Sequence, residues 1–132
     1  ALYSGLDEVG HIARTDDGPV VVMHVIRFND AAAAHTTPDH MEQYQTAAGK
    51  VALGHGVRIS GWFAVEDTII GDGRAWHQVR FNEFPSKAAF MAVVTDPSRL
   101  EAQKNHREVA IADTYALIVR AALNDLEASI DS

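Results

Sequence analysis

Two seven-residue segments of the chain carry the same residue types in the same order. HVIRFND occupies residues 24–30 and HQVRFNE occupies residues 77–83, so His, Arg, Phe and Asn recur at one offset (77 − 24 = 53) and an acid closes each copy. Histidine titrates near neutral pH, which is the property that general acid–base catalysis uses. His24 and His77 are therefore the first candidates for catalytic residues.

Alternation of side chains along a strand assigns both histidines to otherwise apolar faces. The face of His24 also carries Phe28, and the face of His77 also carries Phe81. We expect both faces to lie beneath helices, so that the two imidazoles meet in one pocket. An unsatisfied buried polar group costs roughly 1–3 kcal/mol, so two imidazoles in one apolar layer favour a chemical role.

Helices are expected to complete this pocket from above. His106 falls on an inward stripe with Ala102 and Val109 at helical spacing, and Tyr44 lies on the apolar face of an earlier helix. The predicted catalytic residues are His24, His77 and His106, and the predicted substrate-binding residues are Tyr44, Phe28, Phe81 and Phe90.

The opposite strand faces carry Arg27 and Arg80, together with Trp76 and Gln78. We assign these four residues to the interior between two subunits. The forked guanidinium groups could hold a carboxylate or a phenolate. Intersubunit salt bridges, for instance with Glu83, are the more common role for arginines at an interface.

Two other interpretations remain open at this stage. The first is a binding or structural module, in which the histidines only hydrogen-bond backbone carbonyls. The second is a metal site made of histidines, since zinc and copper accept imidazole ligands. The sequence contains no HxH or HxxxH pair, and it lacks the GxSxG, Walker, GxGxxG and HExxH motifs. We therefore predict no metal and no cofactor.

Composition narrows the classes of partner. The 132 residues include 18 acidic and 11 basic side chains, for a net charge of −7, and no cysteine. An acidic chain is a poor match for nucleic acid or an anionic membrane, because phosphate binding needs a basic surface. The N-terminus does not resemble a secretory signal, and no apolar run is long enough to cross a bilayer. We expect a cytoplasmic protein.

The elements that must position the candidate residues follow from periodicity, caps and turns. A "GDG" hairpin turn is expected between the second and third strands, and Ser98 and Glu101 are spaced as a capping box for the third helix. The predicted order is a strand at 20–28, a helix from Thr37 and Pro38 to Gly54, strands at 57–70 and 74–84, helices starting near 85 and 98, a strand at 114–123 and a loose acidic tail.

This order, β-α-β-β-α-β, predicts an α+β ferredoxin-like fold with a four-stranded antiparallel sheet. We expect the first and third strands to be central neighbours running parallel to each other. The repeated phrase would then occupy equivalent positions in two similar halves. The domain is predicted to span residues 19–121, with an extension at 1–18 and a tail at 122–132.

Motifs in the second half of the chain resemble those of a known family. VRFNEFPS at 79–86, followed by KAAFMAVVTDP and later by HREVAIADTYALIV, is similar to an uncharacterised family of the dimeric α+β barrel superfamily. An acid-Phe-Pro-Ser turn is typical of that family, and Glu83–Ser86 matches it. The resemblance covers roughly residues 19–121, and the N-terminal extension and the long loop that holds His35 depart from it.

The resemblance implies a homodimer whose two sheets face each other to form a barrel, with a pocket between each sheet and its own helices. The superfamily includes cofactor-free monooxygenases, muconolactone isomerases, haem-degrading enzymes and chlorite dismutases. We find no residue pattern typical of the haem-degrading members. The resulting hypothesis is an enzyme with histidine acid–base chemistry, of the monooxygenase, isomerase or lyase type. Its substrate would be a small phenolic or polyketide-like molecule.

Overall fold

Nine strands and helices make up the described part of the protein. The computed structural model describes residues 17–29, 39–107 and 110–131. Thr37 and Pro38, the predicted helix start, and most of the predicted N-terminal extension lie outside these ranges. The elements are β1 (Val20–Phe28), α1 (Asp39–Gly54), β2 (Arg58–Ala64), β3 (Gln78–Phe84), α2 (Lys87–Val94), α3 (Pro97–Ala102), a π-helical turn (Gln103–Arg107), β4 (Ile111–Val119) and α5 (Leu123–Asp131).

The four strands form one antiparallel sheet in the order β2-β3-β1-β4. This confirms the predicted α+β ferredoxin-like plan. The expectation that the first and third strands run parallel is wrong, because β1 and β3 pair antiparallel. The crossover through α1 leaves a space beside β1, and β3 fills it after the chain reverses direction from β2.

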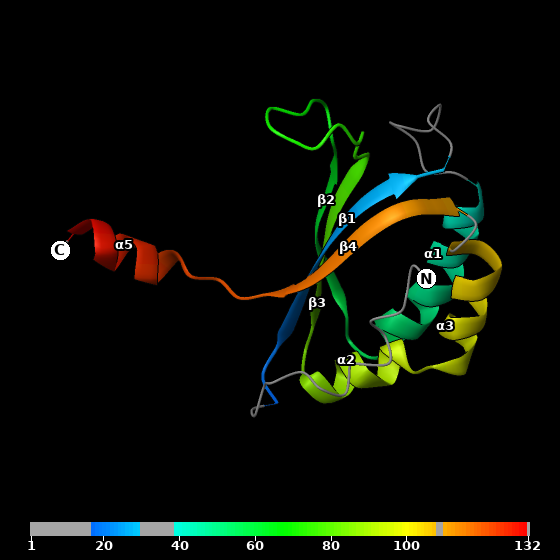
Figure 1. The fold of residues 1–132 in the computed structure, drawn as a ribbon. Helices are drawn as coiled ribbons and strands as arrows, with labels where there is room; N and C mark the ends of the chain where they lie inside the picture. The colour runs from blue at the N-terminus through cyan, green and yellow to red at the C-terminus, as the bar shows by residue number, and fades with distance from the viewer. Residues whose placement is uncertain (1–16, 30–38, 108–109, 132) are drawn as a thin grey trace.

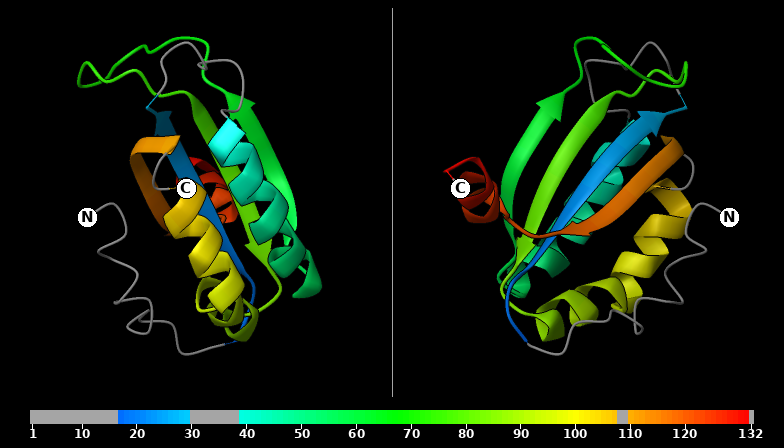
Figure 2. Two further views of the ribbon diagram at one scale, coloured as in Figure 1. Left: turned by 90° about the vertical axis from the view of Figure 1, so that its right-hand side faces the viewer. Right: turned by 60° about the vertical axis from the view of Figure 1, so that its left-hand side comes forward.

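The helices α1, α2 and α3 lie on one side of the sheet (Figure 1). The other side carries none of them, and the view in Figure 2, right, presents this open face of the sheet. Among the described residues the open face exposes Phe63, Tyr115 and Leu117. The fold has two layers, the helices and the sheet. The face of the sheet that the helices do not cover is apolar and is available for contact with another surface.

The core lies between the sheet and the helices, in two clusters of buried side chains. One cluster contains Val20, Val22, Val57, Phe84, Phe90 and Val93, and the other contains Ile26, Phe28, Met41, Ala110 and Ile111. The even-numbered residues of β1 therefore face the helices, as the sequence predicted. A cavity lies among these helix-facing side chains.

Helix caps and loops differ in part from expectation. The helix predicted to start near residue 85 is α2, which begins at Lys87, and the Ser86 hydroxyl caps it by accepting from the Ala89 backbone N–H. The cap of α3 is Asp96, which accepts from the backbone of Ser98 and Arg99, so the predicted Ser98 capping box is wrong. Carboxylates cap as well as hydroxyls, and Pro97 then occupies the first turn.

The predicted strand ends and C-terminal tail also need correction. The predicted hairpin around "GDG" is a longer loop, because β2 ends at Ala64 and β3 begins only at Gln78. The last strand begins at Ile111 rather than at 114. The predicted loose tail is helix α5, whose residues are exposed and which projects away from the body on the side opposite α1 (Figure 1).

Among the residues that the structure describes, no helix has the length and apolar character needed to cross a membrane.

Candidate functional site

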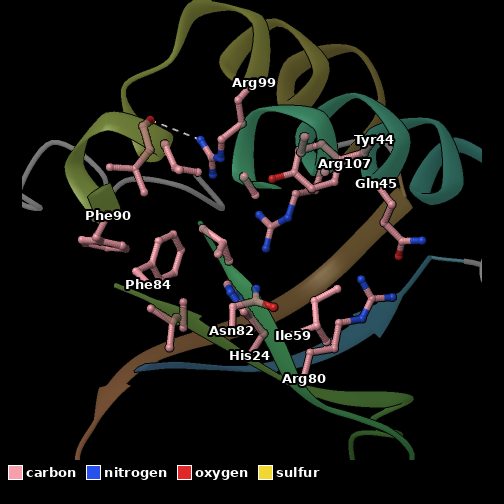
Figure 3. Close-up of a pocket in the computed structure, with 18 of the residues that line it drawn as sticks. His24, Tyr44, Gln45, Ile59, Arg80, Asn82, Phe84, Phe90, Arg99 and Arg107 are labelled. Atoms are coloured by element: carbon pink, nitrogen blue, oxygen red, sulfur yellow. Dashed lines mark hydrogen bonds between the residues drawn. The ribbon is translucent and has the colours of Figure 1, made fainter. Parts of the chain in front are cut away.

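A cavity of about 590 Å³ lies between the sheet and helices α1, α2 and α3. This volume is in the usual range for small-molecule sites. Figure 3 shows polar side chains directed into it from both layers. Its polar lining residues are His24, Tyr44, Gln45, Asn82, Arg80, Arg99, Arg107 and Thr114, and its apolar wall includes Val22, Ile26, Met41, Trp62, Phe84, Phe90 and Val93.

His24 lies at the floor of the cavity, in the middle of β1. Its Nδ1 atom is buried and has no hydrogen-bond partner in the described part of the chain. Burial, together with the positive charges of Arg80 and Arg99, lowers the pKa of His24 from 6.5 to about 4. The imidazole is therefore neutral at neutral pH and offers an unused nitrogen to a ligand.

Arg80 is the direct cross-strand partner of His24, so both side chains lie on the helix-covered face. The prediction that Arg80 faces the subunit interior is therefore wrong, as is the same prediction for Gln78. The guanidinium of Arg80 lies 3.7 Å from the centre of the Trp62 ring, and its Nε donates to Gln78 Oε1 at 2.9 Å. Burial lowers the pKa of Arg80 to about 10.

Two more arginines enter the cavity from the helix layer (Figure 3). Arg99 of α3 donates to the Val94 carbonyl at 3.2 Å. Arg107 of the π-helical turn lies 5.6 Å from the centre of the Tyr44 ring. Burial raises the pKa of Tyr44, so its phenol stays protonated. Tyr44 lines the cavity as the sequence predicted.

His77 does not line the cavity. Its Nδ1 accepts a hydrogen bond from the Phe28 backbone N–H at 2.9 Å, and its ring stacks on Phe28 with centres 5.8 Å apart. The backbone N–H of His77 also donates to the Ile26 carbonyl. His77 therefore links the segment before β3 to the end of β1 by hydrogen bonds. The predicted meeting of His24 and His77 in one pocket is wrong. Antiparallel register puts the even-numbered residues of β3 opposite His24.

His106 does not reach the cavity either. The predicted α-helical stripe assumed 3.6 residues per turn, but the turn Gln103–Arg107 is π-helical and shifts the inward position. Arg107 is buried there and lines the cavity, whereas His106 is only half-buried. The expected triad of histidines is thus reduced to His24.

The remaining candidates divide between the two faces of the sheet. Phe90 lines the cavity as predicted, while Phe28 belongs to the second core cluster beside it. Phe81 lies on the open face, where it contacts Phe63. Trp76 also lies outside the cavity, 5.3 Å from Tyr115 between ring centres.

Arg27 does not join Arg80. It forms a salt bridge with Asp113 of β4 at 2.7 Å, within the same chain. Glu83, a candidate intersubunit partner, is paired with Arg58 at 2.5 Å. The two arginines of the repeated phrase therefore serve opposite faces of the sheet, and only Arg80 belongs to the candidate site.

Sequence reasoning missed Gln45, Asn82, Arg99 and Arg107. Asn82 is in the repeated phrase, and antiparallel pairing of β1 with β3 would have placed it with Arg80. Gln45 follows Tyr44 on α1, and its Oε1 is buried without a hydrogen-bond partner in the described ranges. Arg99 and Arg107 carry no motif, and the inward direction of Arg107 depends on the π-helical turn.

The described residues bring together no three His, Asp or Glu side chains that could hold a metal ion. The histidine-only metal site would require His24, His77 and His106 to converge, and the cavity admits only the first of them.

Comparison with known proteins shows the fold. No protein-family profile and no curated protein matches the chain. A solved structure of a protein of unknown function from Rhodopseudomonas palustris has a TM-score of 0.72 and 23% identity, over 92% of this chain and 94% of that one. A dabb family protein with a ferredoxin-like fold from Mesorhizobium loti has a TM-score of 0.58 and 13% identity, over 79% and 97%.

A third similar structure is a dimeric protein of unknown function with a ferredoxin-like fold from Bacteroides fragilis. Its TM-score is 0.50 at 14% identity, over 81% of this chain and 100% of that one. These structures agree on a ferredoxin-like α+β architecture.

Proposed function

We propose that the protein is a small-molecule enzyme that transfers a proton between His24 and a partly aromatic ligand in the cavity. The observation that carries this proposal is that His24 lines the 590 Å³ cavity while its buried Nδ1 has no hydrogen-bond partner among the described residues. An unsatisfied buried polar atom is costly for folding, so its retention favours a role with a ligand. His77 and His106 take no part in this proposal.

The proposed step is removal of a proton from a carbon next to a carbonyl group. The C–H bond breaks, the proton passes to His24, and the electron pair moves onto the carbonyl oxygen as an enolate. Arg80, paired with His24 across the strands, stabilises the oxyanion, and the protonated Tyr44 phenol can donate to it. Return of the proton at another carbon gives isomerisation, and loss of a leaving group gives lyase chemistry.

The low pKa of His24 is compatible with this role. Arg80 and Arg99 are among its causes. An oxyanion that forms beside these cations offsets their field on the imidazole, which raises the proton affinity of His24 during the step. The cavity thus favours a neutral base before reaction and a protonated one beside the enolate.

Deuterium exchange tests the proposal. 2,4-Dihydroxyacetophenone, a phenolic methyl ketone, is incubated with the protein in D₂O, and deuterium uptake at its methyl group is followed by NMR. We expect exchange faster than in buffer, loss of the acceleration in His24→Gln, and retention in His106→Gln. Binding of the ketone without accelerated exchange would favour a non-catalytic binding module.

We also propose that the protein forms a homodimer through the open face of the sheet. Phe63, Tyr115 and Leu117 are each about half exposed on this face, although side chains of these types are usually buried. The similar structure from Bacteroides fragilis is described as dimeric. Docking of two such faces would join the sheets into a barrel and leave each cavity open on the helix side.

A further inference from the structure

The charge balance of the cavity distinguishes it from the rest of the molecule. The protein carries a net charge of −7, yet no Asp or Glu is found among the residues that line the cavity in the described ranges. Its charged lining residues are Arg80, Arg99 and Arg107, contributed by β3, α3 and the π-helical turn. The three side chains are 5%, 8% and 5% exposed.

Buried and exposed arginines have different partners. Arg27, Arg58 and Arg74 are partly or largely exposed, and each forms a salt bridge with a carboxylate. Arg80 is bonded to the neutral amide of Gln78 and stacked on Trp62. Arg99 donates a hydrogen bond to the backbone carbonyl of Val94. Folding usually pairs a buried charge, so this distribution is the reverse of the expected one.

We infer that the cavity binds a carboxylate attached to a flat apolar body, with the carboxylate held by Arg80 and Arg99. This inference rests on the proposed function, because the same cavity and the same ligand are involved. A carboxylate supplies the negative charge that the described lining residues lack, and it matches the planar fork of a guanidinium.

The rest of the lining fits the body of such a ligand. Met41, Phe84, Phe90 and Val93 form an apolar wall. Trp62 stacks on the guanidinium of Arg80, which holds this side chain in one orientation before a ligand arrives. The buried Oε1 of Gln45 is an acceptor for a hydroxyl on the ligand. A hydroxylated aromatic or polyketide-derived acid has all of these features.

Matched pairs of ligands test the inference by calorimetry. The pairs are benzoate and benzamide, 2-naphthoate and 2-naphthamide, and biphenyl-4-carboxylate and biphenyl-4-carboxamide. Within a pair the apolar body is the same and only the charge differs. We expect at least one carboxylate to bind about tenfold or more tightly than its amide, since charge-assisted hydrogen bonds in a buried site are strong. This preference should persist in 0.5 M NaCl, which screens surface charges.

Three variants test which arginines cause the preference for a carboxylate over its amide. Arg80→Met and Arg99→Met should each reduce it to less than about threefold, since each loses one of two cationic partners, without weakening amide binding. Arg58→Gln, which removes an exposed paired arginine outside the cavity, should leave it unchanged. If one Met variant does not fold, the other Met variant still measures the loss of one cationic partner. Arg80→Lys, which keeps the charge, then measures the loss of the forked donors alone.

The outcomes separate this inference from the proposed function. Equal binding of acids and amides would overturn the inference. It would still support the binding of small molecules in the cavity. A preference that survives both Met substitutions, or disappears in 0.5 M NaCl, would also overturn it. Binding of none of the three pairs would overturn the inference, whereas the proposed function is decided separately by deuterium exchange of the phenolic ketone.

Discussion

His24 and Arg80 are directly opposite each other on the central strands β1 and β3, and both side chains face the helices. The pKa of each side chain is lowered. Burial is the main cause for both, and the charge of Arg80 is the second cause for His24. The pair therefore combines a neutral proton acceptor with a cation, which suits a ligand that becomes or remains an anion.

The stability of the protein should depend on pH through His24. Its pKa is about 4 in the folded protein and 6.5 when exposed. Between these values the unfolded chain binds a proton that the folded protein does not, so the free energy of unfolding falls as pH decreases from 6.5 to 4. The loss is up to about 3 kcal/mol. Urea unfolding across this range should show a shallower pH dependence for His24→Gln, and parallel curves would contradict the assignment.

Arg80→Met should stabilise the ligand-free protein by about 1–2 kcal/mol. The lowered pKa of Arg80 indicates a penalty for burying its charge, and this penalty exceeds the roughly 1 kcal/mol of each of its two hydrogen bonds to Gln78. Methionine keeps the contact with Trp62 without the charge. Denaturant unfolding without ligand measures the change. Destabilisation by more than about 1 kcal/mol would show that the arginine is a structural residue.

His77→Leu should destabilise the fold by about 2–3 kcal/mol, because the buried N–H of Phe28 loses its acceptor and the ring stack is lost. His106→Gln, at a half-buried position, is the control and should change stability by less than about 1 kcal/mol. The measurement is urea unfolding, combined with deuterium exchange of the bound ketone. A stable His77→Leu protein that has lost the exchange reaction would restore His77 as a catalytic candidate.

Leu117→Lys should convert the proposed dimer to a monomer without loss of fold. Leu117 lies on the open face, half exposed, next to Tyr115 and opposite Met23 of β1. Two lysines forced together at a two-fold interface repel each other and lose apolar contact. Sedimentation velocity at micromolar concentration measures the change. Wild-type protein that sediments as a monomer would contradict the assembly.

Much of the fold could be predicted from local sequence signals. The β-branched run of β1, the Ser86 cap and the β-α-β-β-α-β order each follow from short-range chemistry, and the structure agrees with them. The direction and register of β3 could not be predicted in the same way. Alternation shows which residues of a strand share a face, but long-range pairing decides which face lies under the helices.

The dependence of register on long-range pairing explains why the predicted contact between His24 and His77 was wrong. The repeated phrase suggested that His24 and His77 occupy equivalent places, yet the antiparallel partner of His24 is Arg80. A second error came from the π-helical turn, which replaced His106 with Arg107 at the inward position. Tyr44 and Phe90 line the cavity, because each lies on the apolar face of a regular helix, and their role in substrate binding stays a prediction.

The most direct test of the central claim is a titration of the histidine ring nitrogens by NMR while 2-naphthoate is added. We expect the His24 signals to shift and the pKa of His24 to rise from about 4, because the bound carboxylate offsets the charges of Arg80 and Arg99. The signals of His77 and His106 should change little. Saturable binding that leaves His24 unperturbed, or that moves His77 instead, would contradict the account.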